Sequence, residues 1–169
     1  MLVGHSMSGQ VASLAGAAAG GALRGLVLVT PVPVDGLPLP PDAAGLFSSS
    51  GEDRGKQGTI LGLACTSICD DAKGRMLDIA GAISKETIRS LFETWSKGAP
   101  GDVLSQIKAP TLVLATDDPF LPPAFLTEAY VRKLPRGRLA FLPGAGHYPQ
   151  VERPRETAAV LVAFLAALS

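Results

Sequence analysis

Four short runs of apolar residues divide this chain into units of a strand followed by a helix. The runs are "MLV" at 1–3, "LVLVT" at 26–30, "TLVLA" at 111–115 and "LAFL" at 139–142. They are continuous rather than alternating, which is typical of strands buried on both faces of a parallel sheet. With 47% hydrophobic residues, a chain of 169 residues can bury one such core. The sequence therefore predicts an α/β fold with a mostly parallel sheet of about four strands.

Helical segments connect these strands. The stretch 9–20 is rich in small residues that suit close packing on a sheet, and 122–134 begins with Pro and ends with Arg and Lys. A closing helix is predicted over 155–168, with Pro154 directly before it. Strands that alternate with helices in this way indicate a parallel α/β sheet.

The segment between the second and third strands breaks this alternation. It is rich in Pro and Gly at first, continues as a polar loop over 47–59 and ends in two helical segments, the second carrying an apolar stripe that includes Trp95. We predict a helical lid inserted at 37–108, in which Trp95 packs against the core or the lid rather than holding a cofactor. Residues 1–36 and 109–169 then form the remaining core.

Composition excludes several classes of function. Lys plus Arg and Asp plus Glu are both 15, so the net charge is zero and a nucleic acid partner is not expected. Cys65 and Cys69 have no further Cys or His at ligand spacing, and on a helix they would share one face as small buried residues. The chain opens without a basic signal segment, and its last apolar stretch is shorter than the ~20 residues of a membrane span. These features predict a cytoplasmic protein with no membrane association.

The stretch "GHSMSG" at 4–9 carries the first candidate for chemistry. Ser6 follows a strand and precedes a helix, so the chain must turn sharply and present the hydroxyl group. Gly4 and Ser8, two residues to either side, are small enough for strand and helix to approach one another. A serine hydroxyl is a poor nucleophile on its own and needs a base, which a third group orients.

Candidates for the base and the acid follow the later strands. His147 lies on a Gly-flanked loop after the last strand, whereas His5 is expected to be a buried structural residue that points away from Ser6. Asp117 and Asp118 both follow the third strand, and either could orient the imidazole. Because the carboxyl ends of parallel strands share one edge of the sheet, we expect these side chains to meet there.

In combination these motifs resemble the α/β-hydrolase fold of the lipase and esterase type, from its nucleophile elbow onward. "LVGHSMSGQVA" resembles the elbow, "APTLVLATDDPFLPP" the acid turn and "PGAGHYPQVERPRETAAVLVAFL" the histidine loop with the closing helix. The resemblance implies that Ser6 is the nucleophile and His147 the base. The family's acid typically stands four residues before a Pro, which favours Asp118 ahead of Pro122 and leaves Asp117 as the alternative.

The resemblance also implies a reaction. A serine at the elbow disfavours epoxide hydrolases and haloalkane dehalogenases, which carry Asp there. It indicates a serine hydrolase that cleaves a carboxylic ester or related acyl bond of a small molecule through an acyl-enzyme, without a metal or organic cofactor. The backbone N–H of Met7 would supply one oxyanion-hole donor.

Family members have four strands before the elbow, and a loop after one of them supplies the second oxyanion donor. We expect neither in this chain. The first strand would then have an open edge, which a second copy of the chain or a complementing chain is expected to cover. The alternative interpretation is a truncated, non-catalytic α/β-hydrolase remnant that binds a small molecule or a partner.

Overall fold

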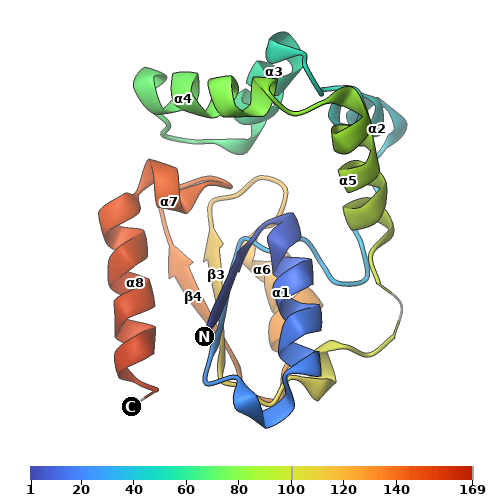
Figure 1. Ribbon diagram of the computed structural model, residues 1–169. Coiled ribbons are helices and arrows are strands. Elements are labelled where there is room, and N and C mark those ends of the chain that lie inside the picture. The colour runs from blue at the N-terminus through green and yellow to red at the C-terminus, as the bar shows by residue number, and fades with distance from the viewer. Residues whose placement is uncertain (100, 169) are drawn as a thin grey trace.

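A computed structural model of the chain, which describes residues 1–99 and 101–168, contains a parallel sheet with helices on both faces (Figure 1). The sheet has four strands in the order β1-β2-β3-β4, and every neighbouring pair is parallel. The strands are β1 (Leu2–His5), β2 (Leu26–Val29), β3 (Thr111–Thr116) and β4 (Gly137–Leu142). The predicted α/β class is confirmed, with β1, β3 and β4 somewhat longer than the apolar runs.

Side chains of the central strands alternate between two hydrophobic layers. Leu26, Leu28 and Val113 face one layer, in which α1 (Met7–Ala18), α6 (Pro123–Leu126) and the π-helical turn η3 (Thr127–Val131) also bury side chains. Val27, Val29 and Leu114 face the other, against which α8 (Pro154–Ala166) packs. Figure 1 shows α1 and α8 on opposite sides of the sheet. Full burial on both faces explains why β2 and β3 read as continuous apolar runs.

Four helices connect β2 to β3 and lie beyond the carboxyl ends of the strands (Figure 1). They are α2 (Pro41–Ser48), α3 (Arg54–Ala64), α4 (Asp70–Gly81) and α5 (Lys85–Lys97). The predicted polar loop over 47–59 is wrong, because the Asp53 side chain accepts a hydrogen bond from the Lys56 N–H and starts α3 there. The boundaries of the lid at 37–108 stay a prediction.

Short elements complete the chain. The turns η1 (Gly20–Ala22) and η2 (Leu104–Gln106) precede β2 and β3, and α7 (Pro149–Glu152) precedes α8. The fully buried Tyr130 of η3 donates a hydrogen bond from its hydroxyl to the Val32 carbonyl at 2.6 Å, which ties this helical segment to the chain leaving β2. The helix predicted at 122–134 is formed by α6 and η3, which follow one another without a break.

The two cysteines do not share a helix face, which corrects the sequence-based expectation. Cys65 ends α3 and is partly buried, whereas Cys69 precedes α4 and is exposed. Burial raises the pKa of Cys65 to about 12, so this thiol stays protonated at neutral pH.

Across residues 1–99 and 101–168, His, Cys, Asp and Glu form no group of three or more that could hold a metal ion. Among the described residues, no helix has the length and hydropathy of a membrane span.

The turn from β1 into α1 depends on close backbone packing at Gly4. A Cβ atom at this position would lie 2.4 Å from the Ser8 carbonyl oxygen and 2.8 Å from the Ala12 Cβ. Gly9 makes a similar close approach, because a Cβ there would lie 2.6 Å from the Cβ of Pro31. The small residues of this turn thus hold strand and helix together without room for another methyl group.

We expect Gly4→Ala to lower the free energy of unfolding by at least about 2 kcal/mol, because the added methyl group meets backbone atoms. The matched control is Gly62→Ala in α3, where a Cβ meets no atom within 4 Å. That control should be neutral or stabilising by up to about 1 kcal/mol, since Ala favours a helix. Urea unfolding measures both, and equal effects of the two substitutions would contradict the packing argument.

Candidate active site

Ser6 occupies the strained turn between β1 and α1. Its backbone has φ 52° and ψ −124°, a conformation that costs a residue other than glycine about 1–3 kcal/mol. The Ser6 N–H donates to the Val29 carbonyl at 3.1 Å, and the Ser6 carbonyl accepts from the N–H groups of Gly9 and Val32 at 2.9 and 3.1 Å. These three backbone hydrogen bonds hold the strained residue in place. Ser6 itself is only partly buried.

A chain of two hydrogen bonds links Ser6 to His147 and Asp118. The Ser6 Oγ lies 2.8 Å from His147 Nε2, and His147 Nδ1 lies 2.6 Å from Asp118 Oδ2. Only 1% of Asp118 is exposed, and its Oδ1 accepts from the Phe120 N–H at 2.9 Å. A carboxylate accepts the Nδ1 proton, so the Nε2 lone pair faces the serine hydroxyl. The three residues expected from the sequence therefore meet at the sheet edge.

Asp117, the alternative acid, has a different partner. It is exposed, and its Oδ2 accepts a hydrogen bond from the Gly144 N–H at 2.7 Å. This bond anchors the loop that carries His147 without reaching the imidazole ring. The structure thus pairs the imidazole with Asp118.

The backbone of His147 is fixed by side chains at the carboxyl ends of β1 and β2. Its carbonyl accepts hydrogen bonds from His5 Nε2 at 2.8 Å and from the Thr30 hydroxyl at 2.9 Å, and its N–H donates to the Ala64 carbonyl at 2.8 Å. Thr30 is fully buried and has φ 38°, an unusual conformation for a branched residue. The sequence analysis did not identify Thr30 as part of the site. Its position directly after a predicted strand was the only feature of the sequence that pointed to it. The contact of His5 with the backbone of the candidate base was missed as well.

His5 is neutral at pH 7. Burial, with a smaller contribution from the neighbouring His147, lowers the pKa of His5 to about 4. The ring centroids of the two histidines are 5.0 Å apart. Because the His147 carbonyl can only accept a hydrogen bond, the single ring proton of His5 lies on Nε2.

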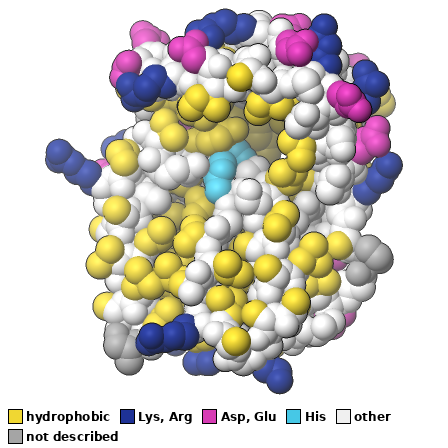
Figure 2. Space-filling model, viewed as in Figure 1, with side chains coloured by type: hydrophobic (Ala, Val, Ile, Leu, Met, Phe, Trp, Pro, Cys, Tyr) yellow, Lys and Arg dark blue, Asp and Glu magenta, His cyan; other side chains and the backbone are white. Residues whose placement is uncertain are grey.

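A cavity of about 220 Å³ opens beside Ser6 and His147. Figure 2 shows histidine surface in a hollow bordered by hydrophobic side chains. Trp95 lines this cavity and packs against Phe47, with ring centroids 5.8 Å apart, so the predicted packing role of Trp95 is confirmed. Among the described residues that line the cavity, none is Asp, Glu, Lys or Arg. The remaining wall is formed by Val32, Leu37, Leu39, Ile60, Ala64, Phe120, Leu121 and Tyr148.

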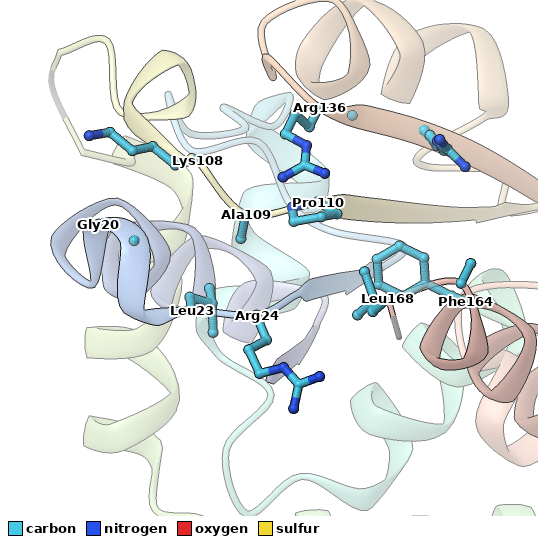
Figure 3. A pocket seen from close by; sticks show the side chains of 13 residues that line it. Gly20, Leu23, Arg24, Lys108, Ala109, Pro110, Arg136, Phe164 and Leu168 are labelled. Atoms are coloured by element: carbon cyan, nitrogen blue, oxygen red, sulfur yellow. The ribbon is translucent and has the colours of Figure 1, made fainter.

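A larger hollow of about 800 Å³ lies at the other end of the sheet (Figure 3). Its walls include residues that precede β2, β3 and β4, together with the exposed cations Arg24, Lys108, Arg136 and Arg138. In Figure 3 the side chains of Arg24 and Arg136 both extend downward, whereas the Lys108 side chain extends to the left, away from them. Parallel sheets bind ligands at the carboxyl ends of their strands, so the smaller cavity beside Ser6 is the candidate active site.

Comparison of the sequence with models of protein families gives a result that agrees with the parallel sheet and the strained turn at Ser6. A sequence model of the alpha/beta hydrolase family matches residues 1–160. The chain belongs to the alpha/beta hydrolase family. No curated protein sequence matches it significantly.

Solved structures share the fold of this alpha/beta hydrolase. An esterase from Exiguobacterium antarcticum is similar with a TM-score of 0.85 at 16% identity, over 98% of this chain and 66% of that one. A bromoperoxidase from Bacillus anthracis gives 0.82 at 18% identity, over 98% and 66%. A thermophilic esterase from Thermogutta terrifontis gives 0.73 at 23% identity, over 99% and 64%. The chain therefore spans less than two thirds of the length of these structures, and the similarity establishes the fold.

The lowered pKa of His5 predicts a pH dependence of stability. The unfolded state takes up a proton below pH 6.5, whereas folded His5 stays neutral down to about pH 4, so this alpha/beta hydrolase loses stability as the pH falls through this window. Between pH 7 and pH 5 the contribution of His5 amounts to about 2 kcal/mol. His5→Gln keeps an amide donor without a titrating group and should remove this contribution. Urea unfolding at both pH values tests it, and an identical pH dependence of both proteins would contradict it.

Proposed function

We propose that this alpha/beta hydrolase is a serine hydrolase that cleaves a carboxylic ester or related acyl bond of a small molecule. The observation that carries the proposal is the unbroken hydrogen-bond chain from Ser6 through His147 to Asp118 beside an apolar cavity. A hydroxyl, an imidazole and a buried carboxylate in this order are the arrangement that activates a serine nucleophile. Two of the three similar structures named above are esterases, which agrees with the proposal.

The proposed reaction has two halves. Ser6 Oγ attacks the acyl carbon while its proton moves to His147 Nε2, and the Asp118 carboxylate stabilises the imidazolium that forms. The tetrahedral intermediate expels the alcohol, which takes the proton from Nε2 and leaves an acyl-enzyme. Water then attacks this ester with His147 as base, and the second collapse releases the carboxylic acid and returns the proton to Ser6.

Met7 is the proposed source of one oxyanion-hole donor. It follows Ser6 directly and opens α1, where backbone N–H groups have no acceptor within the helix. A donor aimed at the developing oxyanion is worth roughly 3–4 kcal/mol of transition-state stabilisation in other hydrolases. In the proposed reaction the Met7 N–H therefore stabilises the developing oxyanion.

The cavity favours an uncharged acyl group of modest size. Its volume of about 220 Å³ is below the 300–1,000 Å³ typical of drug-sized ligand pockets. Phe47, Trp95 and Phe120 line it, and Phe47 contacts both other rings edge-on, at centroid distances of 5.8 and 6.2 Å. An anionic acyl group would lose its hydration there without gaining a cationic partner.

The first measurement is hydrolysis of p-nitrophenyl acetate and butyrate by the full chain. Ser6→Ala and His147→Ala should each reduce the rate by roughly 10³-fold or more, and Asp118→Asn by a similar factor, because the imidazole loses its orientation. The matched control is Asp117→Asn, which keeps an oxygen acceptor for the Gly144 N–H and should stay within about threefold of the unmodified chain.

Labelling by a fluorophosphonate probe distinguishes this function from a non-catalytic binding protein. The probe should react with Ser6 in the folded chain and not with Ser6→Ala. A folded chain without Ser6-dependent labelling or hydrolysis would instead support the binding interpretation. Loss of activity in Asp117→Asn but not in Asp118→Asn would reverse the assignment of the acid.

We also propose that another chain, either a second copy or a complementing chain, covers the open side of β1. This strand is outermost in the sheet, and 51% of Val3 is exposed, whereas parallel strands are normally buried. Val11 of α1 and Val162 of α8, on the flanking helices, are 60% and 62% exposed. Figure 2 shows hydrophobic side chains gathered on this face, where Figure 1 places the N-terminus. An apolar face beside an unpaired strand edge favours association.

Light scattering coupled to size-exclusion chromatography should therefore show a dimer or a larger species, or a complex with the complementing chain. Val3→Lys should shift the equilibrium toward the monomer, because it places a charge on the strand edge. The control is Ile79→Lys, which replaces a residue of α4 that is 71% exposed and should leave the mass unchanged. A stable, well-folded monomer under all conditions would rule out the proposed association.

A further inference from the structure

The carboxylate of Glu152, at the end of α7, joins two segments that are far apart in the sequence. Its Oε2 accepts hydrogen bonds from the Thr66 N–H at 2.7 Å, the Ser67 N–H at 2.8 Å and the Thr66 hydroxyl at 3.1 Å. Its Oε1 accepts from the Gly146 N–H at 3.0 Å and the Tyr148 N–H at 3.2 Å. One side chain thus receives five hydrogen bonds, which come from the connection between α3 and α4 and from the loop around His147.

The two segments also touch directly. The His147 N–H donates to the Ala64 carbonyl at 2.8 Å, and the Ser67 hydroxyl donates to the Gly144 carbonyl at 3.0 Å. At Gly146, a Cβ would lie 2.3 Å from the Ala64 carbonyl oxygen, so the backbones are as close as glycine allows. Ala64 lines the candidate active-site cavity. The carboxylate therefore holds the candidate base and one wall of the cavity in a single unit.

The hydrogen bonds to Glu152 favour its ionised form. Burial alone would raise the pKa of Glu152, but the hydrogen bonds from four backbone N–H groups outweigh burial and lower it below its ordinary value. The group is therefore ionised at neutral pH and accepts through both oxygens. A glutamine here would have only one acceptor oxygen, and its NH₂ group would face a pair of N–H donors.

We propose that Glu152 is a positioning residue that aligns His147 and sets the cavity wall at the end of α3, so that base and substrate pocket are organised together. The proposal rests on the proposed hydrolase function. Because both features depend on one carboxylate, its loss should change kcat and KM together. An anchor with only a structural role would lower the stability and leave both constants of the folded protein unchanged.

Amide hydrogen exchange tests the contact independently of any activity. In Glu152→Gln, exchange of the amides of Thr66, Ser67, Gly146 and Tyr148 should accelerate by about tenfold or more. One N–H pair then faces an NH₂ group instead of an acceptor, and the other pair is exposed as the two segments separate. The control is Glu128→Gln, which removes a charge from an exposed ion pair with Arg132 and should leave these amides unchanged. Unchanged exchange at the four amides in Glu152→Gln would overturn the proposal.

Kinetics on p-nitrophenyl butyrate test the consequence for the site. Glu152→Gln should lower kcat by about tenfold or more and raise KM, whereas Glu128→Gln should leave both within about twofold. Glu152→Asp keeps the charge on a shorter side chain and should recover part of the kcat that Glu152→Gln loses. If Glu152→Gln does not fold, Glu152→Asp is measured in its place. Faster exchange with unchanged kcat and KM would overturn the positioning role. Absence of Ser6-dependent hydrolysis in the unmodified chain would contradict the proposed function instead, and the exchange result would still decide whether Glu152 joins the two segments.

Discussion

Parallel pairing of the four strands is the constraint on which the rest of the site depends. It brings the carboxyl ends of β1, β2, β3 and β4 to one edge, and Ser6, Thr30, Asp118 and His147 each follow one of these ends. Ser6 and His147 are 141 positions apart in the sequence, yet their side chains share a hydrogen bond. A one-residue slip of any strand would turn its side chains to the opposite face. The register of the parallel pairs sets where each strand ends, so it also sets the distance between the Ser6 hydroxyl and the His147 imidazole.

Two of the three non-glycine residues with positive φ in the described part of the chain lie where this geometry must be held. Ser6 and Thr30 both have positive φ, and they follow neighbouring strands. The N–H of Ser6 donates to Val29 of β2, and the N–H of Thr30 donates to Leu114 of β3, so each strained residue continues the hydrogen bonding of the sheet. The sheet core thus supplies the stability that offsets about 1–3 kcal/mol of strain at each position. Flexible loops could not hold both residues in such conformations.

The sequence predicted those parts of the site that depend on local pattern. Buried strands and the small residues around Ser6 leave periodic or compositional signals, which predict Ser6, His147 and either Asp117 or Asp118 at strand ends. The choice of Asp118 came from the family resemblance. The Thr30 hydroxyl donates to the distant His147 carbonyl, and the Glu152 carboxylate accepts from the distant N–H groups of Thr66 and Ser67. Such bonds leave no periodic signal in the chain. Asp117 and Asp118 are adjacent, so only the direction of each side chain separates their roles. The start of α3 was missed because a polar stretch capped by Asp53 has the composition of a loop.

The neutrality of His5 links burial at the elbow to the chemistry of the proposed base. In the proposed reaction His147 becomes cationic, and a second charged imidazole with its ring centroid 5.0 Å away would oppose that step by electrostatic repulsion. Burial prevents this by keeping His5 unprotonated at neutral pH, because its pKa is lowered to about 4. The neutral ring still donates its Nε2 proton to the His147 carbonyl, so it fixes the backbone of the base without placing a charge beside it. A lysine or arginine in this place could donate the same hydrogen bond but would repel the imidazolium, whereas a buried histidine provides the donor alone.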